Sequence, residues 1–190
     1  MNKNELKSIA EGLIETFNIA GQESIELYAK GLKIEIKADN SPVSNGDLRC
    51  NELITKKILE LTPNIPIVSE ETVDLKIKNK NKIFWLIDPI DGTKEYIAGK
   101  NEYTLNAALI IDKVPSIGLV GAPKKRQLFY SYGLGESYII ENDKKVKNNC
   151  AKKTPKDEVI ALSSASHPSE EIMSVLKKHY DMEEDWKGEL

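Results

Sequence analysis

The sequence predicts a layered α+β fold, in which helices pack on sheets and the two kinds of element follow one another in mixed order. Three observations predict it. Apolar residues recur at helical spacing near the N-terminus, several later segments are the short apolar runs typical of strands, and turn-forming residues separate them. The 190 residues, of which 40% are hydrophobic and 30% charged, exclude collagen-like, low-complexity and largely disordered classes.

Two helices are predicted in the first sixty residues. The apolar residues of segment 3–30 fall on one face of a helix, and Gly31 is a suitable stop. The turn-rich segment ADNSPVSNGD separates this helix from the next. Either Ser44 or Asp47 can cap the second helix, which is predicted over residues 48–59.

Alternating or continuous apolar runs predict the strands. The unbroken run IFWLI at 83–87 is typical of a strand buried on both faces. The lysine-rich segment 142–157 predicts a boundary between an N-terminal part, residues 1–150, and the beginning of a second part, residues 151–190. Strands are predicted for residues 32–37, 66–69, 83–87, 103–111, 114–122, 127–131, 137–140 and 159–162, followed by a turn and a helix over 169–179.

Composition excludes several classes of function. The net charge of −3 gives no general electrostatic case for binding a nucleic-acid polymer. Two His and two Cys residues nearly exclude a zinc site of several such ligands, and two distant cysteines favour the reducing cytoplasm. No apolar run is long enough for a membrane anchor, and the N-terminus does not resemble a secretory signal.

Asp88 directly follows the apolar run IFWLI, and Asp91 lies three residues further on, in the segment IFWLIDPIDGTKEY. Two carboxylates this close repel unless a cation lies between them, and oxygen ligands without nearby His or Cys favour Mg²⁺. Gly92 permits the tight backbone that opens a helix, and Thr93 lies where free N–H groups can bind a phosphate oxygen. The alternative, that the two aspartates only cap a turn, remains open on these residues alone.

Glu70 and Glu71 follow another short apolar strand, so they can lie at the same sheet edge as Asp88. A lone glutamate pair is typical of a solvated loop. Beside Asp88 and Asp91, the pair supplies the remaining carboxylate of a metal cluster.

Ser69-Glu70-Glu71 together with WLIDPIDGTKEY at Trp85–Tyr96 resembles the inositol monophosphatase superfamily of Mg²⁺-dependent, lithium-sensitive phosphatases. The variant DGTKEY and the upstream DNSPVSNGD are most similar to its bacterial 3′(2′),5′-bisphosphate nucleotidase branch. The resemblance implies a layered α-β-α-β sandwich of the sugar-phosphatase type, whose C-terminal part is incomplete in this sequence.

The resemblance also implies a set of metal ligands. Glu70 and Asp88 would hold the first Mg²⁺ with the backbone carbonyl of Ile90, and Asp88 and Asp91 would hold the second. Relatives bind two or three ions in this site. An Asp that completes the second site belongs to a Trp-Asp-x-Ala-Ala-Gly-like segment that this sequence lacks, so we expect that site to be weakened.

Other residues receive catalytic or substrate-binding roles from the same resemblance. Asp47 and Thr93 would orient and activate a water molecule near Glu70, and the backbone N–H groups of Gly92 and Thr93 would receive the phosphate. Ser166 and His167 would contact the substrate's second phosphate or its sugar. A plain polar strand-to-helix turn is the open alternative for these last two residues.

The implied reaction removes the 3′-phosphate of adenosine 3′,5′-bisphosphate, or of its sulfated form, by metal-activated water in sulfur metabolism. The expected partner is a small phosphate ester, with a homodimer or a completing chain left open. An inositol or sugar phosphatase is one alternative. A catalytically weak fragment that lacks the third metal-ligand Asp is another.

Overall fold

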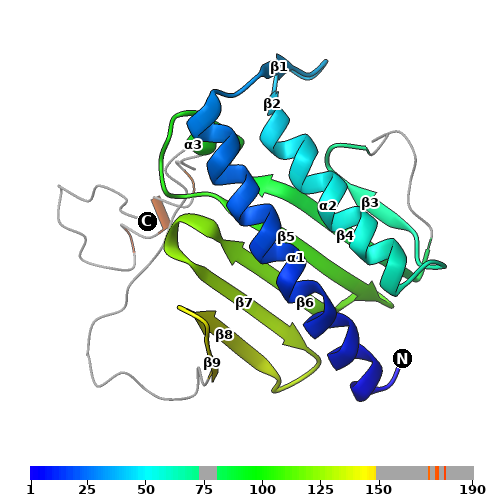
Figure 1. Ribbon diagram of the computed structural model, residues 1–190. Coiled ribbons are helices and arrows are strands. Elements are labelled where there is room, and N and C mark those ends of the chain that lie inside the picture. The colour runs from blue at the N-terminus through cyan, green and yellow to red at the C-terminus, as the bar shows by residue number, and fades with distance from the viewer. Residues whose placement is uncertain (73–80, 149–170, 172–173, 176–177, 179–190) are drawn as a thin grey trace. The chain divides into compact units, whose positions relative to one another are not determined.

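The computed structural model describes residues 1–72, 81–148, 171, 174, 175 and 178. The chain divides into two compact units, Met1–Asn149 and Cys150–Leu190, and the first is described below (Figure 1). Its elements are α1 (Lys3–Lys30), β1 (Ile34–Ile36), β2 (Pro42–Ser44), α2 (Asn45–Leu61), β3 (Ile67–Ser69), β4 (Ile83–Asp91), α3 (Thr93–Ile97), β5 (Thr104–Ile111), β6 (Val114–Ala122), a short 3₁₀ helix (Pro123–Lys125), β7 (Gln127–Tyr132), β8 (Ser137–Glu141) and β9 (Lys144–Lys147).

Both predicted N-terminal helices are confirmed, and their ends follow from capping chemistry. Asn2 and Glu5 form a capping box at the start of α1, and Gly31 ends the helix with a positive φ of 94°. For α2 the two predicted caps act together. Ser44 is the N-cap residue, and Asp47 completes the capping box from the third helical position.

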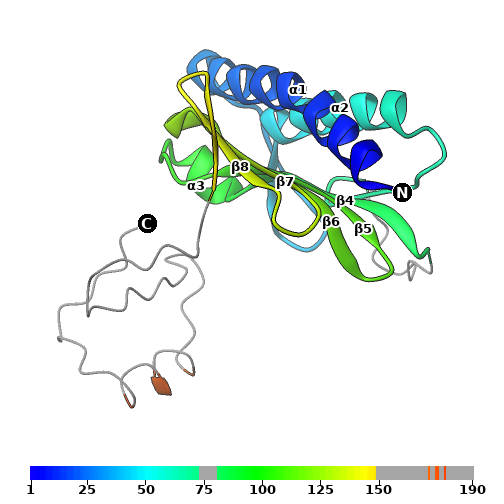
Figure 2. The ribbon, with the colours of Figure 1, turned by 90° about the horizontal axis from the view of Figure 1, so that it is seen from below.

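The main sheet has seven strands in the order β3-β4-β5-β6-β7-β8-β9. Only β3 and β4 pair in parallel; every other neighbouring pair in this sheet is antiparallel. Helices α1 and α2 lie on one face of the sheet (Figure 2). The core forms between them, and its largest fully buried members include Leu13, Ile54, Trp85, Leu105 and Leu109.

Two predictions for strands were wrong in detail. The run at 83–87 is not buried on both faces, because Leu86 points away from the helices and is 48% exposed. The strand also continues through Pro89 to Asp91, with an irregular register between Asp88 and Asp91. The strand expected over 32–37 shortens to β1, which is exposed along its whole length and pairs only with β2.

The predicted boundary segment begins with a strand that its composition concealed. Asn142 and Asp143 both have positive φ and form a two-residue hairpin turn, after which β9 pairs with β8. Lysines dominate β9 because it is an edge strand, where charge discourages pairing with other chains. The strand predicted over 159–162, the turn after it and most of the helix over 169–179 lie outside the described residues.

A candidate metal site at the carboxyl ends of β3 and β4

The parallel pairing of β3 with β4 places Glu70 beside Asp88. Ser69 is in register with Ile87, and the backbone N–H of Glu70 donates a 3.1 Å hydrogen bond to the Ile87 carbonyl. The next residue in each segment is acidic, Glu70 after β3 and Asp88 within β4, and the charge of Glu70 acts on Asp88. Because the carboxyl ends of parallel strands meet at one sheet edge, two segments remote in sequence bring their acidic groups together there.

Asp88 lies close to two other carboxylates, those of Glu70 and Asp91. Burial, followed by the nearby carboxylates of Glu70 and Asp91, raises the pKa of Asp88 to about 7. Its Oδ1 atom is buried and has no hydrogen-bond partner among the residues that the structure describes. A half-buried carboxylate that has a buried, unpaired oxygen and lies near two other carboxylates fits the chemistry of a hard divalent cation.

Lys37 supplies the local positive charge. Its Nζ lies 3.3 Å from Oε1 of Glu70 and 3.0 Å from the carboxylate of Glu71, whose side chain is only 3% exposed. In this arrangement no three Asp, Glu, His or Cys side chains within residues 1–72 and 81–148 form a group that could hold a metal ion. The Glu70 carboxylate forms an ion pair with Lys37. It therefore does not complete a group of three acidic side chains with Asp88 and Asp91. Sequence reasoning missed Lys37 because the hairpin that carries it is remote from Glu70 in the chain.

Asp47 and Thr93 form the second part of the site. Asp47 is fully buried, and its Oδ2 accepts hydrogen bonds from the backbone N–H and the hydroxyl of Ser44 at 2.8 and 2.6 Å. Its Oδ1 accepts a 2.9 Å hydrogen bond from the hydroxyl of Thr93, which also lies 3.1 Å from the Ile90 carbonyl oxygen. The start of α2 is thereby joined to the start of α3.

Gly92 and Tyr96 fix the short helix that carries Thr93. Gly92 has a φ of 90°, and a Cβ there would lie 3.0 Å from the Glu102 carbonyl oxygen, so a side chain would be both strained and crowded. Tyr96 is buried and donates a 2.6 Å hydrogen bond to the Ser24 carbonyl of α1. Its ring also packs against Gly46.

The model of the inositol monophosphatase family matches residues 5–187, nearly the whole sequence. The chain belongs to this family. The superfamily resemblance and the layered α+β fold predicted from the sequence are thereby confirmed.

Members of this family with curated names resemble the chain over most of its length. A 3′(2′),5′-bisphosphate nucleotidase CysQ of Escherichia coli O157:H7 is 34% identical over 163 residues, which cover 84% of this chain and 66% of that protein. A CysQ of Haemophilus influenzae is 28% identical over 170 residues, covering 86% of this chain and 62% of that protein. The chain therefore spans less than two thirds of these relatives' length.

Solved structures of family members share the fold. CysQ from Bacteroides thetaiotaomicron superposes with a TM-score of 0.72 at 29% identity, covering 90% of this chain and 68% of that one. An IMPase/NADP phosphatase complexed with Mg²⁺ and phosphate superposes with a TM-score of 0.62 at 18% identity, covering 70% and 51% of the two chains. The second comparison concerns the fold alone.

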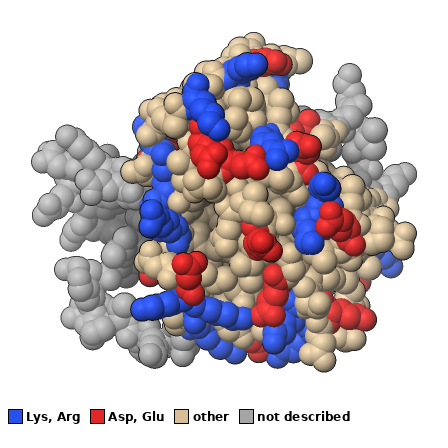
Figure 3. All heavy atoms as spheres, viewed as in Figure 1, with Lys and Arg blue, Asp and Glu red and all other residues tan. Residues whose placement is uncertain are grey.

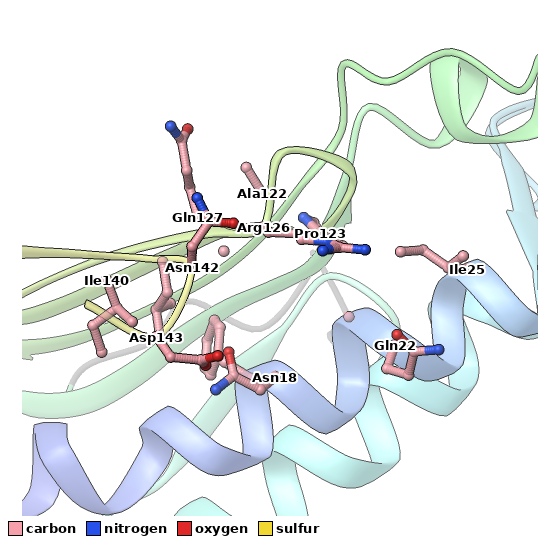
Figure 4. Close-up of a pocket in the computed structure, with 14 residues that line it drawn as sticks. Asn18, Gln22, Ile25, Ala122, Pro123, Arg126, Gln127, Ile140, Asn142 and Asp143 are labelled. Atoms are coloured by element: carbon pink, nitrogen blue, oxygen red, sulfur yellow. The ribbon is translucent and has the colours of Figure 1, made fainter. Parts of the chain in front are cut away.

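Other surfaces of this family member lie apart from the carboxylates. A cavity of about 530 Å³ opens between α1 and the β6–β7 connection, with Phe17 and Leu128 among its lining residues and none of the predicted site residues (Figure 4). Acidic and basic side chains are interspersed over the face that carries α1 and α2 (Figure 3).

Among the described residues, no helix has the length and apolar character needed to cross a membrane. Ser166 and His167 lie outside the described residues.

Proposed function

We propose that the chain functions in a Mg²⁺-dependent phosphatase that removes the 3′-phosphate of adenosine 3′,5′-bisphosphate or its sulfated form. The observation that carries the proposal is the Asp88 carboxylate, which has a buried, unpaired oxygen and lies close enough to Glu70 and Asp91 to interact with their charges. The substrate is proposed because the curated relatives at 28–34% identity are named 3′(2′),5′-bisphosphate nucleotidases.

Glu70, Asp88 and Asp91 are the side chains that would hold Mg²⁺, with the Ile90 carbonyl as a further oxygen. When bound, Mg²⁺ neutralises the phosphate oxygens and lowers the pKa of a water molecule. The strand pairing places the backbones of Glu70, Asp88 and Asp91 near one another at the carboxyl ends of β3 and β4, and binding one ion would require their side chains to turn toward it. We propose no protein nucleophile, since the residues around Asp88 are carboxylates and amides.

Thr93 and Asp47 are proposed to orient the attacking water. The Thr93 hydroxyl donates its hydrogen to Asp47, so its oxygen remains free to accept a hydrogen bond from a water molecule near Glu70. Water would attack phosphorus and give up a proton to Glu70, the proposed base, while the bond from phosphorus to the ester oxygen breaks and that oxygen takes a proton from solvent. The backbone N–H groups of Gly92 and Thr93 are the proposed donors to the phosphate.

Phosphate release by the purified chain tests the proposal. We expect release from adenosine 3′,5′-bisphosphate that requires Mg²⁺, stops with chelator, and exceeds release from inositol 1-phosphate. Asp91→Asn should abolish it, whereas Asp112→Asn, in the β5–β6 turn, should not. Faster hydrolysis of inositol 1-phosphate would contradict the proposed substrate. Absence of Mg²⁺-dependent release from any phosphate ester would favour a catalytically weak chain and contradict the proposed activity.

A further inference from the structure

Asn106 is the third residue of β5, whose other residues apart from Thr104 are apolar, in the segment TLNAALII. The antiparallel register places it directly opposite Asp88, and Asp88 in turn neighbours Glu70 across the parallel pair. Its strand neighbours Leu105 and Ala107 are buried against the helices, so Asn106 points to the opposite face of the sheet. Glu70, Asp88 and Asn106 thus stand side by side on three adjacent strands.

The carboxamide of Asn106 has one satisfied end and one unsatisfied end. Its Nδ2 donates a hydrogen bond of 3.4 Å to Oδ2 of Asp91. A carboxylate can only accept in this contact, so the nitrogen must face Asp91 and the oxygen must face away from it. That oxygen, Oδ1, is buried and has no hydrogen-bond partner.

Asp88 Oδ1 and Asn106 Oδ1 are the two buried side-chain polar atoms without a partner in the part of the chain that the structure describes. They belong to residues that are paired across neighbouring strands. Both are acceptors, so neither can satisfy the other. Their shared missing partner must be electron-poor, namely a cation or a hydrogen-bond donor such as the water of a hydrated cation.

The hydrogen bond to Asp91 accounts for the amide nitrogen at this position but not for the buried amide oxygen. On the same sheet face, the in-register neighbour of Asn106 on β6 is Val120, and the neighbour of Val120 on β7 is Phe129. An apolar side chain at position 106 would continue this row without leaving an oxygen unpaired. Within this row of in-register residues, Asn106 is the residue that pairs with Asp88.

We propose that Asn106 is a further residue of the cation site, an inference that rests on the proposed function. Its Oδ1 supplies a neutral oxygen to the divalent cation, directly or through the cation's water. Its Nδ2 positions Asp91. This assignment explains both unpaired oxygens with one ligand.

Mn²⁺ binding to the whole 190-residue chain, followed by the electron paramagnetic resonance signal of free Mn²⁺, tests the proposal without requiring turnover. Asn106→Leu should raise the Mn²⁺ dissociation constant about tenfold, as expected when a residue supporting metal ligands is lost. Asn106→Asp keeps an oxygen and should bind Mn²⁺ more tightly than Asn106→Leu. Ser131→Ala, which alters a polar residue of β7 on the same sheet face, is the matched control and should bind like the wild type.

Thermal unfolding supplies a readout that a structural role would not produce. Without cation, Asn106→Leu should unfold at the same or a higher temperature than the wild type, because it removes an unpaired oxygen. With Mn²⁺, its gain in unfolding temperature should be smaller than that of the wild type. Should Asn106→Leu fail to fold, Asn106→Ser replaces it with the same expected loss of Mn²⁺ affinity.

Unchanged Mn²⁺ affinity in the folded variants would overturn the role of Asn106 and leave the proposed function standing. No Mn²⁺ binding by the wild type would instead overturn the metal-dependent function itself, and the Asn106 inference with it. The two failures are therefore distinguishable.

Discussion

The hydroxyl of Thr93 donates a 2.9 Å hydrogen bond to Oδ1 of Asp47, although 46 residues separate them in the chain. The bond joins the first turn of α2 to the first turn of α3. Because Asp47 also caps α2 through Ser44, one buried carboxylate serves both the helix end and the proposed water-binding position. Local helix stability and the geometry of the candidate site therefore depend on the same side chain.

Thr93→Val is expected to lower both the stability of the fold and the rate of phosphate release, by different amounts. Valine keeps the volume but leaves Oδ1 of buried Asp47 without a donor, which should lower the free energy of unfolding by about 1–3 kcal/mol. Phosphate release should fall about a hundredfold, since the water-orienting oxygen is lost. Urea unfolding and phosphate release by the same preparation measure the two effects.

Thr55→Val is the control for that substitution. Thr55 also donates its hydroxyl hydrogen to an oxygen of the chain, the Asn51 carbonyl at 2.6 Å, but it lies in the middle of α2. We expect a change in unfolding free energy within about 0.5 kcal/mol and unaltered phosphate release. Equal losses of phosphate release in both variants would refute a specific role for Thr93.

Gly46 is expected to tolerate no side chain. A Cβ at this position would lie 2.5 Å from the Tyr96 hydroxyl oxygen and 2.6 Å from Cε1 of the Tyr96 ring. The Tyr96 side chain is held in place, because it is buried and its hydroxyl donates a hydrogen bond to the Ser24 carbonyl. Gly46→Ala should therefore lower the unfolding free energy by about 1–3 kcal/mol, measured by urea unfolding.

Gly118→Ala provides the comparison for Gly46→Ala. A Cβ at position 118 would meet only the Ser131 hydroxyl oxygen, at 3.4 Å, which is an ordinary contact distance. Its expected change is within about 0.5 kcal/mol. A wild-type-like midpoint for Gly46→Ala would show that Tyr96 moves freely and that the contact does not fix α3.

The sequence alone could predict most helices and strands, because their apolar periodicity is strong and their ends carry capping residues. β9 was not predicted, because an edge strand buries few apolar side chains and its lysine-rich sequence is also typical of a loop. The contacts of Lys37 and Asn106 could not be predicted from the sequence for a different reason. Their contacts with Glu70 and Asp91 depend on a hairpin position and a strand register that no local pattern specifies. Asp47 could be recognised as a cap, but its link to Thr93 came only from family resemblance.

Glu136 should give the fold a measurable acid sensitivity. Hydrogen bonds from Lys3, Tyr138 and Lys147 lower the pKa of Glu136 from 4.5 to about 2. A lowered pKa in the folded state means that the stabilisation is present above pH 4.5 and is lost as the pH falls toward 2. Glu136→Gln should therefore lower the urea midpoint at pH 7 and lower it less at pH 3.

Glu141→Gln is the matched control for this pH dependence. Glu141 lies at the end of β8 and accepts a hydrogen bond from a neutral partner, Gln127, at 2.6 Å. Its replacement should change the urea midpoint by a similar small amount at both pH values. If the Glu136→Gln difference were as large at pH 3 as at pH 7, the ionised contacts of Glu136 would not be the source of the stability.

Asp88→Asn is expected to change stability in opposite directions with and without a divalent cation. In the cation-free chain, the substitution removes a half-buried negative charge that is repelled by Glu70 and Asp91, so the unfolding temperature should rise. With Mg²⁺ present, the wild type should gain stability in proportion to the logarithm of the cation concentration, and the variant should gain little. The two curves of unfolding temperature against Mg²⁺ concentration should therefore cross.

Asp39→Asn, which removes an exposed carboxylate from the β1–β2 turn, should respond to Mg²⁺ as the wild type does. A variant curve that stays parallel to the wild-type curve at every Mg²⁺ concentration would mean that Asp88 binds no cation, because a ligand's loss must appear in the slope.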